Sequence, residues 1–338
     1  MAAQPAVHRV FLLGATGTIG LATARALSRA GHSVVCLVRP RRSGHPSGPD
    51  TPDGLRALQA LPGLELRFGD PTQGLSLRRD GLRGEHFDSW VSCLASRTGA
   101  ARDAWAVDHG AHLEALKACQ EAGVRQVVQL SAICVQKPEL EFQKAKLAFE
   151  QTLMQSGLNY SIVRPTAFFK SLSGQFQRVK SGKPYLLFGD GERTACKPIA
   201  DQDLGDFLAS CLQDRSLQRA VLPIGGPGPA LTPREQGLLL FEALGKKPHF
   251  RHVPLALMDA VVGGLSWLGR WSSTAAEKAE FARIGRYYAR ESMLVWNADR
   301  RCYSEQDTPS YGDRTLLDHY RAMARGEVQD QRGDHAVF

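Results

Sequence analysis

Residues 9–20 read RVFLLGATGTIG, a short apolar run that leads into three closely spaced glycines. The apolar run covers residues 10–13, and the glycines are Gly14, Gly17 and Gly20. This pattern is typical of a strand that turns tightly into a helix and brings the backbone close to a diphosphate. The N–H groups of the first helical turn and the helix dipole hold the phosphates in such sites. We therefore predict a dinucleotide site here, with a ligand-free strand–turn–helix as the alternative.

Strand–helix alternation continues beyond this loop and predicts the fold class. Five more short apolar runs lie at residues 33–38, 64–68, 89–94, 126–130 and 160–163. Helical patterns lie between several of them, at residues 53–61, 109–122 and 141–155. Strands that alternate with helices form parallel sheets covered on both faces. We therefore expect an α/β fold with a doubly wound parallel Rossmann sheet.

The alternation becomes irregular after the sixth strand, which divides the chain. We expect an NADP-binding domain over residues 1–170, a smaller C-terminal substrate-binding lobe over 171–325 and a polar tail over 326–338. Short apolar runs at 185–188 and 221–224 are candidates to return to the main sheet.

Composition limits the class of protein. The chain has 338 residues, 43% hydrophobic and 22% charged, which is ordinary for a globular protein of about two lobes. No window approaches the roughly 18 uninterrupted apolar residues of a membrane span. The first strand follows the start of the chain almost directly, which leaves no room for a signal or transit peptide. We expect a cytosolic protein or an organellar one that is already processed.

Cysteine and histidine spacing argues against a metal site. None of the seven cysteines forms a CxxC pair, so disulfide, zinc and iron–sulfur frameworks are poorly supported. His109 and His112 are three apart, but no third ligand lies near, so a solvated helix face is the favoured interpretation. We expect no metal.

The net charge of +8 favours an acidic small molecule or contact with an anionic membrane surface. Nucleic acid is not expected, because no Lys/Arg tract is interleaved with aromatic residues. The sequence indicates no obligate protein partner.

Candidate cofactor contacts follow from the sheet, because ligands bind beyond the carboxyl ends of its strands. Besides the three glycines, these candidates are Thr16, Thr18, Ile19, Arg39, Asp70, Leu94, Ala95, Ser96, Ser131, Pro165, Thr166 and Phe168.

The end of the second strand predicts NADPH rather than NADH. NAD enzymes commonly place a carboxylate there for the ribose 2′-hydroxyl. Here Val38 is followed by Arg39, with Arg41 and Arg42 close behind and no acid at the strand end. A guanidinium pairs with a 2′-phosphate through two parallel hydrogen bonds. Arg39 is the predicted main contact, with a merely solvated loop as the alternative.

Residues 142–146 read FQKAK and resemble the Tyr-x-x-x-Lys motif of short-chain dehydrogenases. In that motif the tyrosine transfers a proton, and the lysine lowers its pKa and holds the ribose. Lys146 keeps the lysine, but Phe142 replaces the tyrosine and carries no proton. We expect Lys146 to bind the nicotinamide ribose and to be a candidate proton source, with a surface lysine as the alternative. Ordinary alcohol–ketone chemistry is not expected.

Several long blocks carry a closer resemblance. They read VSCLASR (91–97), LSAICVQKP (130–138), EFQKAKLAFE (141–150), YSIVRPTAFFKSL (160–172), FGDGERTACKPI (188–199), LPIGGPGPALTP (222–233), IGRYYARESML (284–294) and TPSYG (308–312). These blocks resemble the NADPH-dependent 3,8-divinyl (proto)chlorophyllide a 8-vinyl reductases, which are atypical, NmrA-like short-chain dehydrogenases. The resemblance covers nearly the whole chain, from about Val10 to Gly312.

The resemblance implies reduction of a C8 vinyl group to ethyl in chlorophyll or bacteriochlorophyll biosynthesis. A vinyl group conjugated to a macrocycle accepts hydride at one carbon and a proton at the other, so a tyrosine at position 142 is dispensable. Lys146 is the expected catalytic residue, and the proton donor is Lys146, a bound water or Lys170. The lack of a plastid-targeting extension suggests a bacterial cytoplasmic member, with peripheral association with photosynthetic membranes.

The implied substrate is a flat, largely apolar tetrapyrrole with a propionate. We expect Phe142, Phe169, Lys170 and Tyr287 to contact it. The apolar segments at 255–269 and 275–288 are expected to roof it. Lys170, Lys183 and Arg286 are the candidates for its carboxylate.

Two other functions remain open at this point. One is another atypical NADPH reductase, similar to the isoflavone or quinone reductases. The other is a non-catalytic NADP(H)-sensing regulator or assembly factor, which the loss of tyrosine at Phe142 favours. Oxidation of NADPH with divinyl pigments, and not with quinones, separates all three.

The cofactor assignment predicts the behaviour of one variant. Arg39→Asp should raise the affinity for NADH relative to NADPH, because it removes the partner of the 2′-phosphate and supplies one for a 2′-hydroxyl. Dissociation constants for both nucleotides measure the ratio. An unchanged ratio contradicts the assignment.

Overall fold

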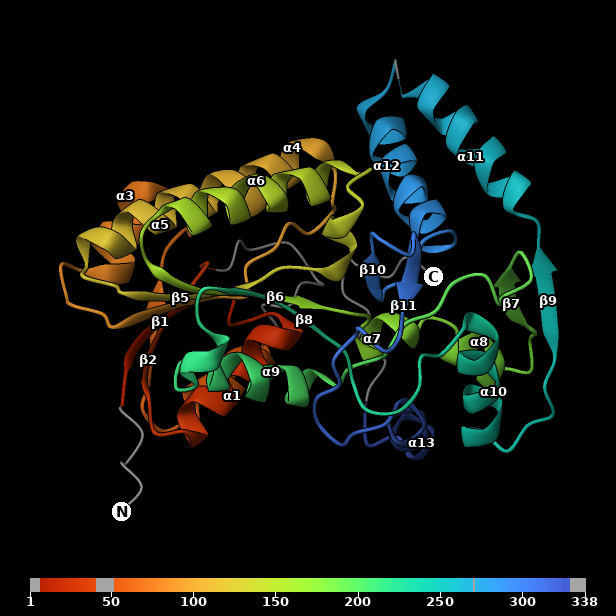
Figure 1. The fold of residues 1–338 in the computed structure, drawn as a ribbon, viewed down its shortest axis with the longest axis horizontal. Helices are drawn as coiled ribbons and strands as arrows, with labels where there is room; N and C mark the ends of the chain where they lie inside the picture. Colours follow the sequence, from red (N-terminus) through yellow and green to blue (C-terminus); the bar gives the residue numbers. More distant parts are fainter. Residues whose placement is uncertain (1–6, 41–51, 270, 329–338) are drawn as a thin grey trace.

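A seven-stranded parallel sheet forms the centre of the computed structural model, which describes residues 7–40, 52–269 and 271–328 (Figure 1). Its strand order is β3-β2-β1-β4-β5-β6-β8, and every pairing is parallel. The strands are β1 (Arg9–Leu13), β2 (Ser33–Val38), β3 (Leu64–Phe68), β4 (Ser89–Ser92), β5 (Gln126–Leu130), β6 (Asn159–Pro165) and β8 (Ala220–Ile224). The expected doubly wound sheet is confirmed.

Helices cover both faces of this sheet (Figure 1). One face carries α1 (Thr18–Arg29), α2 (Pro52–Gln59) and α9 (Asp201–Ser210). The opposite face carries α3 (Gly74–Ser76), η1 (Leu77–Leu82), α4 (Ala101–Ala104), η2 (Trp105–Ala111), α5 (His112–Glu121) and α6 (Glu141–Gln155). Side chains alternate along β1, so that Val10 and Leu12 join the first core while Phe11 and Leu13 join the second.

A second group of elements follows β6 and has a core of its own, built around Phe176, Leu187, Leu240 and Tyr320. Its elements are α7 (Phe169–Leu172), α8 (Phe176–Lys180), β7 (Tyr185–Phe188), α10 (Pro233–Ala243), β9 (Phe250–Val253) and α13 (Leu316–Arg325). The structure also contains the hairpin strands β10 (Val295–Asn297) and β11 (Cys302–Ser304) and the short turns η3 (Ile133–Gln136) and η4 (Arg215–Leu217).

The two apolar runs that were candidates for the main sheet, at residues 185–188 and 221–224, join different sheets. Strand β8 joins that sheet beside β6, whereas β7 pairs in parallel with β9 in a separate two-stranded sheet. The expectation for residues 185–188 is therefore wrong, because the partner strand lies some sixty residues later in the chain and the pairing shows no local signal.

The two apolar segments that were expected to cover the substrate, 255–269 and 275–288, differ in their packing. Helices α11 (Leu255–Leu268) and α12 (Ser273–Tyr288) pack on each other, but α11 lies on the outer side (Figure 1). In α11 only Val262 is buried, while Leu257 is 56% exposed. The end of α12 packs against the sheet domain through Ile284 and Tyr287.

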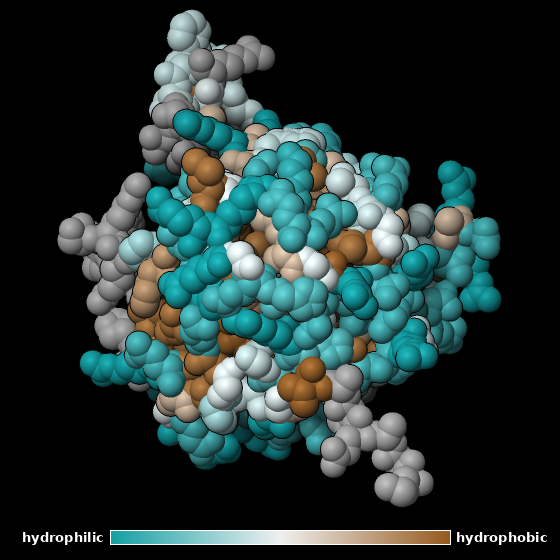
Figure 2. Space-filling view, turned by 90° about the vertical axis from the view of Figure 1, so that its left-hand side faces the viewer, coloured by the Kyte–Doolittle hydropathy of each residue, from teal (hydrophilic) through white to brown (hydrophobic). Residues whose placement is uncertain are grey.

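The outer surface is mixed in character. Figure 2 shows the end of the molecule at the left of Figure 1, where hydrophilic side chains predominate and hydrophobic ones appear between them. Within the residues that the structure describes, no helix has both the length and the apolar character needed to cross a membrane.

Helices α1 and α9 approach each other closely at Gly205. A Cβ atom added to Gly205 would lie 2.6 Å from the carbonyl carbon of Ala22 and 2.9 Å from the amide nitrogen of Thr23. Backbone atoms cannot rotate away as a side chain can, so any larger residue at this position pushes the helices apart.

Gly205→Ala should lower the free energy of unfolding by about 1–3 kcal/mol, because overpacking outweighs the gain in helix propensity. Gly263→Ala in α11 is the matched control, since a Cβ there meets nothing within 4 Å. That control should raise the free energy of unfolding by about 0.5–1 kcal/mol. Urea denaturation measures both, and a Gly205→Ala variant as stable as the parent refutes the close packing.

Candidate active site

The glycine-rich loop is built by close backbone contacts. Gly14 has φ +79°, and a Cβ added there would lie 2.5 Å from the carbonyl carbon and oxygen of Cys93. A Cβ on Gly20 would lie 2.0 Å from the carbonyl oxygen of Gly14. Gly17 precedes the first turn of α1, which contains no acidic residue, and no side chain in the described structure caps it. The cradle and the unpaired N–H groups of this turn fit the diphosphate of a dinucleotide.

Thr18 and Lys170 meet at the start of α1. The Lys170 ammonium on α7 donates a hydrogen bond to Thr18 Oγ1 over 2.9 Å. Asp201 is the first residue of α9. Burial raises the pKa of its carboxyl to about 6, and the nearby positive charge of Lys170 opposes this shift. Lys170, which the sequence placed at the pigment, therefore lies beside the glycine-rich loop.

The remaining strand ends form one edge of the sheet. Arg39 is exposed directly after β2, whereas Arg41 and Arg42 lie outside the described residues. Asp70 follows β3, and its Oδ1 accepts hydrogen bonds from the amide and hydroxyl of Thr72. After β4, Leu94 is buried and Ala95 is exposed. On the loop itself, Thr16 is half-buried and Ile19 is buried.

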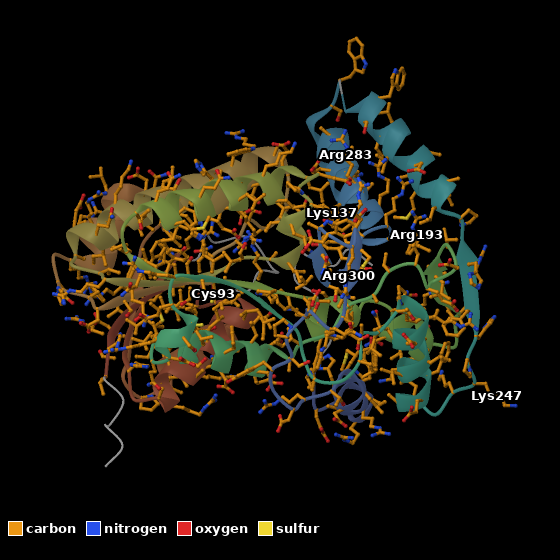
Figure 3. All side chains as sticks on the ribbon, viewed as in Figure 1. Cys93, Lys137, Arg193, Lys247, Arg283 and Arg300 are labelled. Atoms are coloured by element: carbon orange, nitrogen blue, oxygen red, sulfur yellow. The ribbon has the colours of Figure 1, made fainter. Side chains whose placement is uncertain are left out.

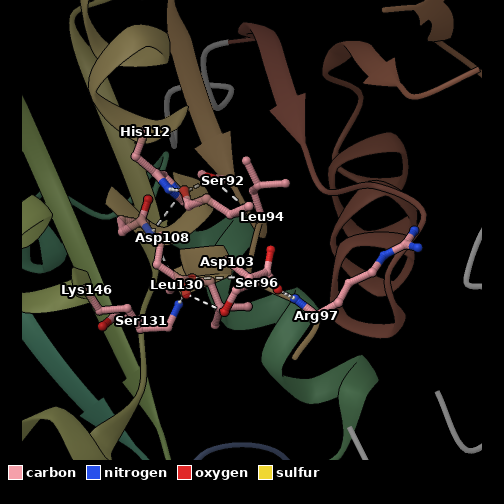
Figure 4. Close-up of polar contacts among 12 residues, drawn as sticks. Ser92, Leu94, Ser96, Arg97, Asp103, Asp108, His112, Leu130, Ser131 and Lys146 are labelled. Carbon is pink, nitrogen blue, oxygen red and sulfur yellow. Dashed lines mark hydrogen bonds and ion pairs between the residues drawn. The ribbon is translucent and has the colours of Figure 1, made fainter. Parts of the chain in front are cut away.

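Lys146 lies in a buried polar cluster (Figure 4). Its ammonium donates to Asp108 Oδ1 over 2.9 Å, and the Lys146 residue is 8% exposed. The Ser96 hydroxyl donates to the other oxygen of Asp108 over 2.5 Å, and Asp108 is 1% exposed. Asp108 thus joins Lys146 on α6 to the loop after β4, and Lys146 is not a solvated surface lysine.

Asp108 was not found from the sequence. It lies on η2, a π-helical segment between α4 and α5, and π-helical turns frequently occur at functional sites. It is thirty-eight residues from Lys146, so neither spacing nor helical periodicity pairs the two. The fold brings them together where η2 packs against α6.

A second buried carboxylate fixes Ser131. Glu150 on α6 is 1% exposed, accepts a hydrogen bond from the Ser131 hydroxyl over 2.5 Å and forms an ion pair with Arg164 on β6. Ser131 is the first residue after β5, so this pair sets how α6 lies across the strand ends. The hydroxyl of Ser131 is directed towards the helix.

His112 lies near the Lys146–Asp108 pair and corrects an expectation. It is fully buried, so the solvated helix face predicted for it is wrong. Its Nδ1 is 2.9 Å from the carbonyl oxygen of Val107 and its Nε2 is 2.9 Å from Ser92 Oγ, which fits a neutral ring that donates at Nδ1. Burial, aided by the charge of Lys146, lowers the pKa of His112 to about 4.

The aromatic candidates line the boundary with α12. Phe142 packs on a cluster that contains Cys134, Ile284 and Tyr287. The Tyr287 hydroxyl lies 3.0 Å from the carbonyl oxygens of both Cys134 and Lys137, so it holds the loop after β5.

The residues after β6 form the last part of the edge. Pro165 ends the strand, Thr166 donates its hydroxyl to the carbonyl of Lys197, and Phe168 precedes α7. Phe169 is buried and packs on His319, with ring centroids 5.4 Å apart, so it belongs to the core of the second group of elements.

Within the described residues no group of three or more His, Cys, Asp or Glu side chains is arranged to hold a metal ion. The seven cysteines are free thiols.

Comparison with known proteins agrees with this geometry. A family model described as NAD(P)H-binding matches residues 14–215. A divinyl chlorophyllide a 8-vinyl-reductase from Oryza sativa subsp. indica is 46% identical over 340 residues, covering 99% of this chain and 83% of the relative. Its counterpart in Arabidopsis thaliana is 46% identical over 343 residues, covering 99% and 81%.

Solved structures share the fold. The complex of an NADPH-dependent quinone oxidoreductase from Escherichia coli with NADPH has a TM-score of 0.64 at 16% identity, covering 93% of this chain and 99% of that one. The leucoanthocyanidin reductase–NADPH complex from Vitis vinifera has a TM-score of 0.65 at 17% identity, covering 94% and 99%.

The sheet order, the glycine-rich loop and the buried lysine at the strand ends define a Rossmann-type NAD(P)H-binding reductase. Within that class, the chain belongs to the divinyl chlorophyllide a 8-vinyl-reductase family.

The comparisons also correct the expected location. Four relatives at 44–46% identity are chloroplastic plant proteins, which overturns the prediction of a bacterial cytoplasmic protein.

His112 predicts a pH dependence of stability. Its folded pKa of about 4 lies below the ordinary value of 6.5, so the unfolded chain binds the proton more readily. Its contribution is present above pH 6.5 and declines as the pH falls towards 4, by up to about 3 kcal/mol.

Unfolding free energies of wild type and His112→Gln, measured from pH 7 to pH 4, test this dependence. The variant should lose less stability over the range than the parent does. His252→Gln, at an exposed histidine, is the control and should follow the parent. Parallel curves for wild type and His112→Gln would show that His112 does not titrate as described.

Proposed function

We propose that this protein uses NADPH to reduce the C8 vinyl group of a 3,8-divinyl (proto)chlorophyllide a to ethyl, giving the monovinyl pigment. It is an oxidoreductase that acts on a carbon–carbon double bond. The observation that carries this conclusion is the identity of 46% over 99% of the chain with a divinyl chlorophyllide a 8-vinyl-reductase. The substrate is accordingly a tetrapyrrole.

The site is compatible with this chemistry. NADPH, when bound, supplies hydride to one carbon of the vinyl group, and the other carbon needs a proton. The conjugated macrocycle carries the charge between the two events, so no carbonyl oxygen has to be protonated. The reaction therefore does not need the tyrosine of the short-chain dehydrogenases, and Phe142 at that position supplies an apolar side chain beside α12.

Lys146 is the proposed catalytic residue. Its ammonium is held by Asp108, and Asp108 is held in turn by Ser96, so the side chain is fixed at the strand ends rather than free to sample solvent. A positioned ammonium can bind the nicotinamide ribose and can deliver a proton, directly or through water. Asp108 is the residue that positions it.

The proposed cofactor contacts follow the sheet edge. Gly14, Gly17 and Gly20 form the cradle of the diphosphate, and Lys170 adds a positive charge there through its contact with Thr18. Arg39, exposed after β2, takes the 2′-phosphate.

Asp70, together with Leu94, Ala95 and Ser96 after β4, borders the adenosine and central parts of the cofactor. Ser131 with Pro165, Thr166 and Phe168 borders the nicotinamide. These assignments rest on the order in which the strand ends follow each other along the edge.

Absorbance spectroscopy tests the function. Purified protein with NADPH and divinyl chlorophyllide should shift the Soret band to the blue while NADPH is consumed. Lys146→Ala should lower kcat/KM by about 100-fold or more, because it removes a positioned acid.

Lys144→Ala is the matched control, since Lys144 lies two residues away on the same helix and pairs with Glu141 at the surface. It should react at the parental rate. Near-parental rates for Lys146→Ala would remove this lysine from the mechanism, and a spectrum that wild type leaves unchanged would refute the function itself.

A further inference from the structure

A pocket lies in the second group of elements, next to the proposed active site. Its cavity volume is about 110 Å³, and it is partly open to solvent. Its walls come from α7, β7, the segment 191–196, the start of α10 and the end of α12. Leu172, Tyr185, Phe188, Tyr288 and Met293 make much of this lining apolar.

Two elements connect this pocket to the strand ends. Ser171 and Leu172 line it from α7, which begins four residues after the end of β6. Tyr288 lines it from α12 and packs against the same cluster as Phe142, with its hydroxyl 3.6 Å from Cys134 Sγ. The pocket therefore lies next to the segments that follow β5 and β6.

The pocket offers one uncommitted positive charge. Arg193 lines it and is exposed, and within the described part of the chain its guanidinium has no ion pair within 4 Å. The charge of Arg193 acts on Asp190, but the two side chains form no ion pair. Asp190 Oδ1 instead accepts hydrogen bonds from the amide groups of Glu192 and Arg193. Figure 3 shows Arg193 beside the end of α12, well apart from Cys93 at the sheet edge.

The acid in the lining is already neutralised. Glu291 forms an ion pair of 2.9 Å with Lys137 and accepts a hydrogen bond from the hydroxyl of Tyr303. The pocket therefore presents an apolar interior and a cation, which suits an apolar ligand that carries a carboxylate.

The substrate has this character, and its shape sets where the cation must lie. In a chlorophyllide the C8 vinyl group and the C17 propionate are on diagonally opposite pyrrole rings. When the vinyl group is at Lys146, the carboxylate is at the far end of the macrocycle. The partner of the carboxylate must therefore lie away from the strand ends, in the second group of elements.

The earlier candidates do not meet this requirement. Lys170 lies against Thr18 at the glycine-rich loop, and Arg286 pairs with Asp259. Lys183 is exposed and is not part of the lining.

We propose that this pocket binds the propionate-bearing half of the tetrapyrrole and that Arg193 binds its carboxylate. The proposal rests on the proposed function for the identity of the pigment. Arg193 is then the residue that distinguishes a free pigment acid from its ester.

Fluorescence quenching of the pigment, which needs no turnover, tests the proposal. Divinyl chlorophyllide and its methyl ester are titrated into wild type, Arg193→Gln and Arg193→Lys. Wild type should bind the acid about tenfold or more tightly than the ester, as a charge-assisted hydrogen bond implies. Arg193→Gln should lose this preference and Arg193→Lys should keep part of it, while the dissociation constant for NADPH stays unchanged in both.

Arg300→Gln is the control, because Arg300 is exposed and lies outside the lining. It should keep the parental preference for the acid. An Arg193→Gln variant that still prefers the acid overturns the proposal. The same conclusion follows if Lys170→Met loses the preference for the acid while Arg193→Gln keeps it. If wild type prefers the acid through Arg193 but reduces no pigment, the pocket assignment stands and the proposed function fails.

Discussion

The close contact of the glycine-rich loop with the strand next to it is the constraint on which the site depends. Gly14 touches the backbone at Cys93, and Gly20 touches Gly14, so side chains at either position would separate α1 from the sheet. This contact directs the positive end of the α1 dipole at the edge where β1 and β4 finish. Lys170 reaches the same helix end from a later part of the chain, and its charge acts on the buried Asp201, so one turn brings segments from both parts of the chain together.

Lys146 and Asp108 add a second constraint, because a buried charge is costly unless it is paired and hydrogen-bonded. Asp108 receives the ammonium of Lys146 and the hydroxyl of Ser96, so its two oxygens are satisfied from α6 and from the loop after β4. The neutral ring of His112 lies near this pair, and the charge of Lys146 helps to keep it unprotonated. The pair thus joins the strand ends to the helix layer and limits the lysine to one position.

The residues that the sequence could reveal are those with a local signal. The glycine spacing, the apolar runs and the Phe142–Lys146 interval each lie within one turn or one strand. These local patterns predicted the sheet, the glycine-rich loop and Lys146. Asp108, Glu150 and the β7–β9 pairing depend on contacts between distant segments, which no periodicity encodes. The prediction for α11 failed for a related reason. An apolar helix usually packs inside a protein, whereas within the described residues α11 packs mainly on α12, and most of its side chains are exposed or half-buried.

The distribution of positive charge completes the argument. A cation that binds an anionic ligand must keep its charge available until the ligand arrives, and Arg39 and Arg193 are exposed accordingly. A cation that serves at the reacting carbon must instead be held still and shielded, because a mobile ammonium would attract the phosphates and the propionate of the ligands. Asp108 gives Lys146 that restraint. In the proposed assignment, separate cations therefore hold the 2′-phosphate, the diphosphate and the carboxylate at the ends of the site, and the paired lysine remains at its centre, where the vinyl group is reduced.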